Sequence, residues 1–215
     1  MSASALTWFC AVAVVLLLLA EVQARRAWRA PAKLAASSAF VAVALALGGV
    51  QSAYGRWIVA ALLLGWLGDA LLLSDRSGPF LGGLGAFLLS HLCFGAAFVV
   101  GGVALPAVAA AALVALAAGL LIWRWLGPHL QGAMRVAVAA YVWVILSMCC
   151  AAAGHAVAQQ RWMALAGALL FAASDLAVAR ERFVAPGRVN RLWGLPTYFA
   201  AQLLLAWTVA TPPGG

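Results

Sequence analysis

Eight long apolar segments, separated by short polar ones, make up most of the chain. They cover roughly residues 4–22, 33–50, 56–74, 79–101, 104–123, 132–154, 161–179 and 191–210. A helix needs about 20 mostly apolar residues to cross a bilayer, and each segment has about that length. The pattern therefore predicts an all-α polytopic integral membrane protein, with about eight transmembrane helices in one bundle that forms a single domain over residues 1–215.

The composition supports a surface that is covered by lipid. Of the 215 residues, 67% are hydrophobic and 8% are charged, whereas soluble domains have about 25% charged residues. The first segment has no Lys or Arg before Arg25. A secretory signal peptide would carry positive charge ahead of its apolar run, so we expect this segment to be a retained span.

The basic residues predict an orientation. The net charge is +8, and the positive residues lie between apolar segments, which favours topology signals and contacts with anionic membrane lipids over nucleic-acid binding. If both termini lie outside, eleven of the 13 basic residues are cytoplasmic, as the positive-inside rule requires. The high Ala, Gly and Arg content favours a bacterial inner membrane. The residues on the cytoplasmic side are Arg25, Arg26, Arg29, Lys33, Arg76, Arg124, Arg135, Arg180, Arg182, Arg188 and Arg191.

The cysteines give no sign of a metal site or a disulfide. Cys10, Cys93, Cys149 and Cys150 all fall within apolar segments, and none has C-x-x-C spacing. We therefore expect them to be small buried apolar side chains.

Two of the five acidic residues lie within apolar segments. Glu21, Asp75 and Glu181 fall at predicted helix ends, where contact with solvent is expected. Asp69 and Asp175 lie roughly 8 Å below the cytoplasmic interface, at 1.5 Å per residue, and an acid at a helix centre costs about 3 kcal/mol to insert. Either each carboxylate pairs with a basic group or caps a helix, or both face a shared polar cavity. A shared cavity can keep one carboxyl group protonated and the other ionised, which suits general acid–base catalysis.

Further polar residues are predicted in the membrane segments. Lys33 begins the second segment, and His91 lies near the middle of the fourth. Tyr141 lies in the inner half of the sixth, while Tyr198 and Gln202 share a face of the eighth because they are four residues apart. Each alone is typical of a satisfied core group, and Lys33 is equally typical of a snorkelling topology residue. Their convergence in one half of the membrane favours a site.

Three stretches resemble the signatures of the YhhN-like family, whose animal members are lysoplasmalogenases. The first is Gly68-Asp69-Ala70-Leu71-Leu72-Leu73, followed by Phe87 and His91 in the next segment. The second covers residues 167–177 and contains Ser174-Asp175, and the third is Tyr198-Phe199-Ala200-Ala201-Gln202. Tyr141 and Met148 also fit, whereas Lys33 matches a lysine that proline usually follows and is followed here by Leu34.

The resemblance implies an enzyme that hydrolyses the vinyl ether bond of lysoplasmalogens. The products would be a fatty aldehyde and glycerophosphoethanolamine or glycerophosphocholine, and no metal or organic cofactor is implied. Protonation of the β-carbon gives an oxocarbenium ion, water adds to it, and the hemiacetal collapses, so an acid and a second carboxylate are enough. Asp69 and Asp175 match the family's proposed catalytic pair, and their order stays open. The residues expected to bind or position the lysophospholipid are Lys33, His91, Tyr141, Ser174, Tyr198 and Gln202, with arginines near Lys33 at the phosphate and the apolar bundle around the chain.

Two other functions are alternatives. A proton-coupled transporter or lipid-binding membrane protein also uses membrane carboxylates, as proton relays. An intramembrane aspartyl protease would show Tyr-Asp, Gly-x-Gly-Asp and Pro-Ala-Leu, whereas here Ser174 precedes Asp175, Trp66 lies two residues before Gly68, and the nearest match to the third element is Leu195-Pro196-Thr197. The sequence contains no pattern that indicates an oligomeric state.

Overall fold

The computed structural model describes residues 1–74 and 76–210, apart from the side chain of Arg26. Asp75 and the Pro- and Gly-rich tail, both expected outside the helices, are outside the described residues. A π-helical turn, η2 (Arg180–Val184), extends α7, and short 3-10 turns, η1 (Gly127–His129) and η3 (Thr208–Ala210), follow α5 and α8. The eight α-helices of the described residues are α1 (Ala3–Val22), α2 (Arg26–Ala46), α3 (Ala53–Leu71), α4 (Ser77–Val100), α5 (Leu105–Leu126), α6 (Gly132–Gln159), α7 (Trp162–Ala179) and α8 (Arg188–Trp207).

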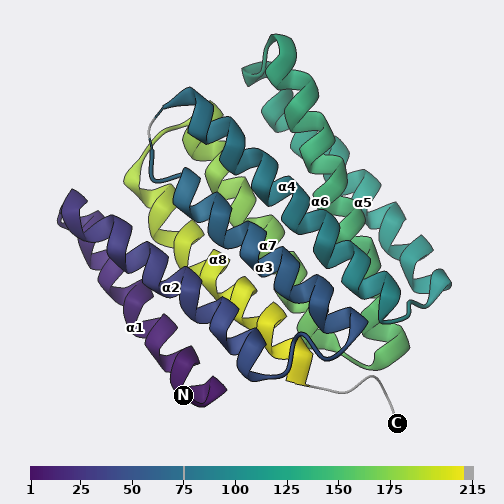
Figure 1. Ribbon diagram of the computed structural model, residues 1–215. Coiled ribbons are helices and arrows are strands. Elements are labelled where there is room, and N and C mark those ends of the chain that lie inside the picture. Colours follow the sequence, from purple (N-terminus) through teal and green to yellow (C-terminus); the bar gives the residue numbers. More distant parts are fainter. Residues whose placement is uncertain (75, 211–215) are drawn as a thin grey trace.

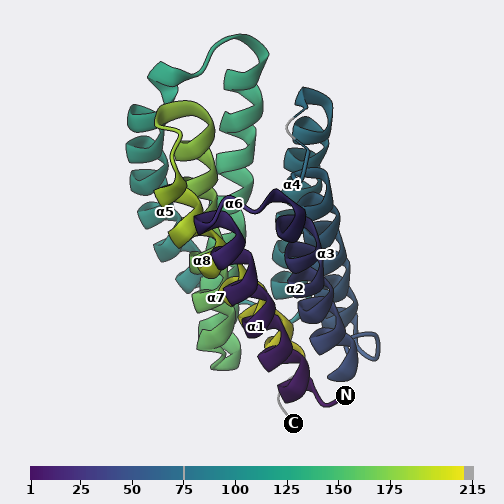
Figure 2. The same cartoon turned by 90° about the vertical axis from the view of Figure 1, so that its left-hand side faces the viewer.

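Helices that follow one another in the chain pack as pairs. α1 packs on α2, α3 on α4, α5 on α6 and α7 on α8, and contacts of α2 with α3, α4 with α6, α6 with α7 and α8 with α1 close a ring. Figure 2 shows α2, α3 and α4 as one layer facing α6, α7 and α8, while Figure 1 shows α1 and α5 at opposite edges of the molecule. The predicted all-helical fold is confirmed.

The helices differ in how much of their surface is covered by protein. By length and composition, six of the described helices can cross a membrane: α1, α2, α4, α5, α6 and α7. α3 and α8 fall outside this set, and both carry polar residues, Asp69 and Gln202, among the side chains that their neighbours bury. In α5, by contrast, Leu126 is the one buried residue. The chain is thus an integral membrane protein, and α3 and α8 also expose apolar side chains at its surface, such as Leu63 and Val189.

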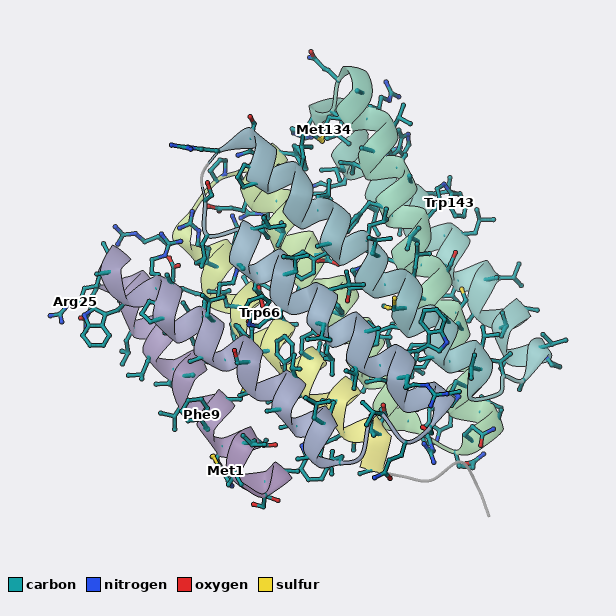
Figure 3. The ribbon with its side chains drawn as sticks, in the orientation of Figure 1. Met1, Phe9, Arg25, Trp66, Met134 and Trp143 are labelled. Carbon is teal, nitrogen blue, oxygen red and sulfur yellow. The ribbon has the colours of Figure 1, made fainter. Side chains whose placement is uncertain are left out.

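Apolar side chains cover the outside of the bundle. Phe9 on α1 and Trp143 on α6 point away from it and are about half exposed (Figure 3). Exposure of such a continuous apolar surface to water is unfavourable, whereas contact with the hydrocarbon of a bilayer is favourable.

The two ends of the bundle differ in charge. The N-terminus and the last described turn, η3, lie at one end (Figure 1). The connections after α1, α3, α5 and α7 lie at the other end, together with the basic residues that the sequence predicts to be cytoplasmic. We refer to this second end as the basic end.

Two helix boundaries change the position of site residues. α2 begins at Arg26, seven residues before the predicted span, so Lys33 lies two turns inside a helix and shares one face with Arg29 and Ser37. α3 ends at Leu71, so Asp69 lies in the last turn of its helix and not five residues inside it. α7 instead continues past Asp175 into η2.

Close contact between α3 and α4 brings the site helices together. Gly68 faces the ring of Phe87, and a Cβ atom at that position would lie 2.7 Å from the ring. Glycine is therefore required for this approach, which places Asp69 next to the aromatic core.

Candidate active site

Asp69 lies in a closed network of three donors from two other helices. Lys33 Nζ on α2 is 3.0 Å from Oδ1, while the hydroxyl groups of Ser37 and Tyr198 donate to Oδ2 at 2.5 and 2.8 Å. The Asp69 side chain is 2% exposed. Both oxygens of this buried carboxylate therefore have partners, an ammonium group for Oδ1 and two hydroxyl donors for Oδ2.

This network gives Lys33 a different position from the one predicted. The sequence suggested a lysine at the lipid headgroup level, where it would bind phosphate. In the structure its ammonium group points into the bundle and pairs with Asp69.

Asp175 lies on the opposite layer and has fewer partners. Its Oδ2 atom is 3.1 Å from His91 Nε2 on α4, and Tyr141 on α6, whose ring packs edge-on against that of His91, interacts electrostatically with the same carboxyl group. The His91 contact is short but not well aligned as a hydrogen bond, and neither Nε2 nor Oδ2 has another partner among the described residues. The Asp175 side chain is 14% exposed, compared with 2% for Asp69.

The contact of His91 Nδ1 with a backbone carbonyl oxygen indicates which ring nitrogen carries the hydrogen. His91 Nδ1 is 2.5 Å from the carbonyl oxygen of Phe87. Because a carbonyl oxygen only accepts, Nδ1 carries a hydrogen, and Nε2 of a neutral ring is then an acceptor. Two acceptors 3.1 Å apart, Nε2 and Asp175 Oδ2, need one proton between them. One proton shared across this contact would satisfy both atoms.

Aromatic rings fill the space between the two acids. The Tyr198 ring packs edge-on against Phe87 and Phe171, at 5.7 and 5.5 Å between centroids, and Phe171 lies 4.3 Å from the ring of His91. These contacts fix the orientation of Tyr198 and His91. They keep the two carboxylates apart while leaving both at one cavity.

Gln202 supports the network from behind. It is fully buried one turn beyond Tyr198, and both polar atoms of its amide lack a well-aligned hydrogen bond among the described residues. A Cβ atom at Gly65 would lie 2.8 Å from the Gln202 amide nitrogen and 3.3 Å from the Tyr198 hydroxyl. The glycine thus makes room for these two polar groups.

A cavity of about 720 Å³ joins both acids to the surface. Its wall includes most of the predicted site residues, whereas His91 and Gln202 are fully buried and do not line it. The hydroxyl of Ser174 donates to the carbonyl oxygen of Phe171 at 2.8 Å, so its polar group is already used within its own helix. The predicted residues in the wall are Lys33, Asp69, Tyr141, Ser174, Asp175 and Tyr198.

One arm of the cavity is an apolar groove between α5, α6 and α7. Along α7 it extends from Asp175 to Leu165, ten residues or about 15 Å of helix. That length is about half of a ~30 Å hydrocarbon core, as a lipid chain in one leaflet requires. The residues of this groove are Ala111, Val114, Ala115, Ala118 and Ile122 on α5, Ile145, Leu146, Cys149 and Ala153 on α6, and Leu165, Leu169 and Leu176 on α7.

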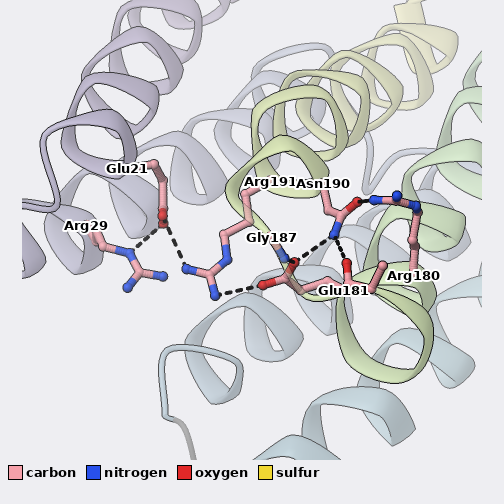
Figure 4. Close-up of polar contacts among 8 residues, drawn as sticks. Glu21, Arg29, Arg180, Glu181, Gly187, Asn190 and Arg191 are labelled. Carbon is pink, nitrogen blue, oxygen red and sulfur yellow. Dashed lines mark hydrogen bonds and ion pairs between the residues drawn. The ribbon is translucent and has the colours of Figure 1, made fainter.

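The other arm opens at the basic end through a charged group of side chains. We call Glu21, Arg29, Glu181, Asn190 and Arg191 the mouth cluster; all five line the cavity. Arg191 on α8 lies between the two carboxylates, with Nη1 3.4 Å from Glu21 and Nη2 3.0 Å from Glu181 (Figure 4). Arg29 Nε contacts Glu21 at 2.5 Å, and the Asn190 amide donates to Glu181 at 2.8 Å.

The sequence reasoning missed Ser37 and the mouth cluster. Glu21 was expected to be solvated at a helix end, but it is 8% exposed and paired with two guanidinium groups. The spacing of Arg29, Lys33 and Ser37, at every fourth residue, was a usable signal for one polar helix face. The apolar pattern places the start of this helix at Lys33, so Arg29 falls outside the predicted helix and the shared face is not apparent.

A comparison with protein families assigns the chain as a whole. The model of the YhhN family matches residues 6–209, which is nearly the whole chain. This protein belongs to the YhhN family. No solved structure matches the chain.

Curated relatives carry a more specific name. The chain is 38% identical over 183 residues to a protein of Mycobacterium tuberculosis named lysoplasmalogenase, with 79% of this chain and 67% of that protein covered. It is 35% identical over 155 residues to a lysoplasmalogenase of Bos taurus, covering 69% of this chain and 63% of the bovine protein. A lysoplasmalogenase of Sus scrofa is 33% identical over 171 residues, with 74% and 66% covered. The chain thus spans about two thirds of the length of these relatives.

Proposed function

We propose that this protein is a membrane hydrolase that cleaves the vinyl ether bond of lysoplasmalogens. The observation that carries the proposal is the single cavity that joins a charged mouth, two differently partnered aspartates and an apolar groove. The names of the relatives support the same reaction. We further propose that the basic end faces the cytoplasm of a bacterial inner membrane, with both termini outside, because that end gathers the arginines.

In this mechanism Asp175 is the acid. Its carboxyl group, which holds the proton next to His91 Nε2, protonates the β-carbon of the vinyl ether, and the double-bond electrons form the new C–H bond. The result is an oxocarbenium ion at the ether oxygen and α-carbon. Asp175 is then a carboxylate that accepts a proton from the attacking water, whose oxygen bonds to the α-carbon.

Asp69 supplies fixed negative charge in the same cavity. Its three donors occupy both oxygens, so its role here is to stabilise the oxocarbenium ion electrostatically, without taking part in proton transfer. The hemiacetal then collapses: its hydroxyl group loses its proton as the C=O bond of the aldehyde forms, the bond from the α-carbon to the glycerol oxygen breaks, and the glycerol oxygen takes up that proton. One water is consumed, and the acid form of Asp175 is regenerated.

The direct test is product analysis with purified protein in D₂O. Lysoplasmenylethanolamine should give a fatty aldehyde with one deuterium on the carbon next to the carbonyl group, because that carbon receives the acid's proton. The saturated alkyl ether analogue is the matched control, since it has no double bond to protonate and should stay intact. Cleavage of both ethers, or of neither, would contradict the proposal. Lipid flux through proteoliposomes without cleavage would favour the transporter.

A further inference from the structure

The mouth cluster and the neighbouring Arg182 place both signs of charge at one opening. Three guanidinium groups, of Arg29, Arg182 and Arg191, line the cavity together with the carboxylates of Glu21 and Glu181. A site for an anion alone would not place two carboxylates beside it, because like charges repel. The arrangement is complementary to a headgroup that carries a phosphate and a cation.

The carboxylates are held in place but retain acceptor capacity. Each Glu21 oxygen accepts from one guanidinium group, Oε1 from Arg29 and Oε2 from Arg191. A carboxylate oxygen can accept two hydrogen bonds, so each Glu21 oxygen has capacity for one more donor. Glu181 is fixed by Arg191, by the Gly187 backbone N–H at 2.7 Å and by the buried Asn190 amide.

The positive groups are oriented in a similar way. Arg29 contacts Glu21 through Nε, which leaves its two terminal nitrogens outside that contact. Arg182 lies over the ring of Phe80, 4.3 Å from the centroid. Guanidinium groups bind phosphate oxygens well because they present several N–H donors in a plane.

The spacing between the mouth cluster and the acid suits a glycerophospholipid. Asp175 and Glu181 are six residues apart along α7 and η2, or about 9 Å. This matches an extended glycerol phosphate between an ether bond at Asp175 and a headgroup at the mouth.

We infer that the mouth cluster binds the headgroup as a zwitterion and selects a primary ammonium, as in ethanolamine, over the quaternary ammonium of choline. The inference rests on the proposed function, whose cavity it shares. A primary ammonium has three N–H donors for Glu21 and Glu181, whereas a quaternary ammonium has none and is usually held by aromatic rings. At this mouth the Phe80 ring is already covered by Arg182, and Phe183, which also lines the cavity, packs against the apolar cluster of Leu126 and Leu130.

The test measures binding without any reaction. The probes are saturated 1-alkyl lysophosphoethanolamine and its choline counterpart, which cannot be cleaved as vinyl ethers, and their affinities for the purified full-length protein are compared in detergent. We expect the ethanolamine lipid to bind about tenfold more tightly, as hydrogen bonds to charged groups predict. Glu21→Gln should remove most of that difference by weakening the ethanolamine lipid alone. Arg76→Gln, at the same end but outside the cavity wall, should leave it unchanged.

The outcomes separate this inference from the proposed function. Equal affinity for the two probes in the wild-type protein would overturn the inference, even if vinyl ether cleavage is intact. Discrimination without cleavage would support the inference while the proposed reaction fails. If Glu21→Gln does not fold, Glu181→Gln and the wild-type ratio still decide the matter.

Discussion

Asp69 and Asp175 line the same cavity, yet they differ in the number and kind of groups that contact their carboxylates. Around Asp69, an ammonium group and two hydroxyls occupy both carboxylate oxygens, and the side chain is almost fully buried. Around Asp175, the closest contact is a histidine nitrogen with no other partner, and the apolar groove begins beside it. A carboxylate with all its donors in place is a stable fixed charge, whereas one that shares a single proton with a neutral base can give that proton away.

The largest difference between the two sites is expected in the rate of aldehyde release when each acid is replaced in turn. We expect Asp175→Asn to lower the rate of aldehyde release by about 10⁴-fold and Asp69→Asn by about 10²-fold, because the first loses the proton donor and the second loses only stabilising charge. Initial rates with lysoplasmenylethanolamine measure both. Equal losses, or a larger loss for Asp69→Asn, would break the division of roles.

The contrast should reverse when stability is measured. Asp69→Asn leaves the Lys33 ammonium buried without its counter-ion and should cost about 3 kcal/mol of unfolding free energy. Asp175→Asn should cost less than about 1 kcal/mol. Thermal or denaturant unfolding in detergent checks this. The control is the double variant Lys33→Met with Asp69→Leu, which removes both charges and should recover most of the loss; a double variant as unstable as Asp69→Asn would argue against the ion pair.

Substitution of a residue that contacts Asp175 should lower kcat more than substitution of a residue that contacts Asp69. His91→Gln should lower kcat by about 10²-fold with little change in KM, because His91 positions the proton of Asp175 and lies behind the cavity wall. Tyr198→Phe removes one of the three donors to Asp69 and should lower kcat by less than about tenfold. A change in KM alone for His91→Gln would indicate that the residue only shapes the pocket.

The smallest effect is expected in the groove beside Asp175. Ala115→Phe should narrow the groove and lower the rate on a long-chain lysoplasmalogen by about fivefold, with less effect on a short-chain one. Ala117→Phe is the matched control, because Ala117 is on the same helix but does not line the cavity. A chain-length series of substrates measures the effect, and the same profile for both variants would place the chain elsewhere.

The sequence alone determined the class of fold and the pair of acids. Apolar segments of membrane length require helices, because each helix satisfies its own backbone hydrogen bonds within the bilayer. Acidic residues are so costly in lipid that Asp69 and Asp175 could be recognised without a structure. Both kinds of information are local, since each depends on residues close together in the chain.

Only the tertiary structure decided which groups are partners. Lys33 and Asp69 are on different helices, as are Tyr198 and Asp69, and Arg191 reaches Glu21 from the far end of the chain. Such pairs depend on how helices pack and rotate, which hydropathy along one helix does not record. The first turns of α2 were also hidden, because Arg and Ala form helices readily but do not register as an apolar segment. The packing therefore surrounded Asp69 with three donors and left Asp175 beside His91 and Tyr141, although the two acids look alike in sequence.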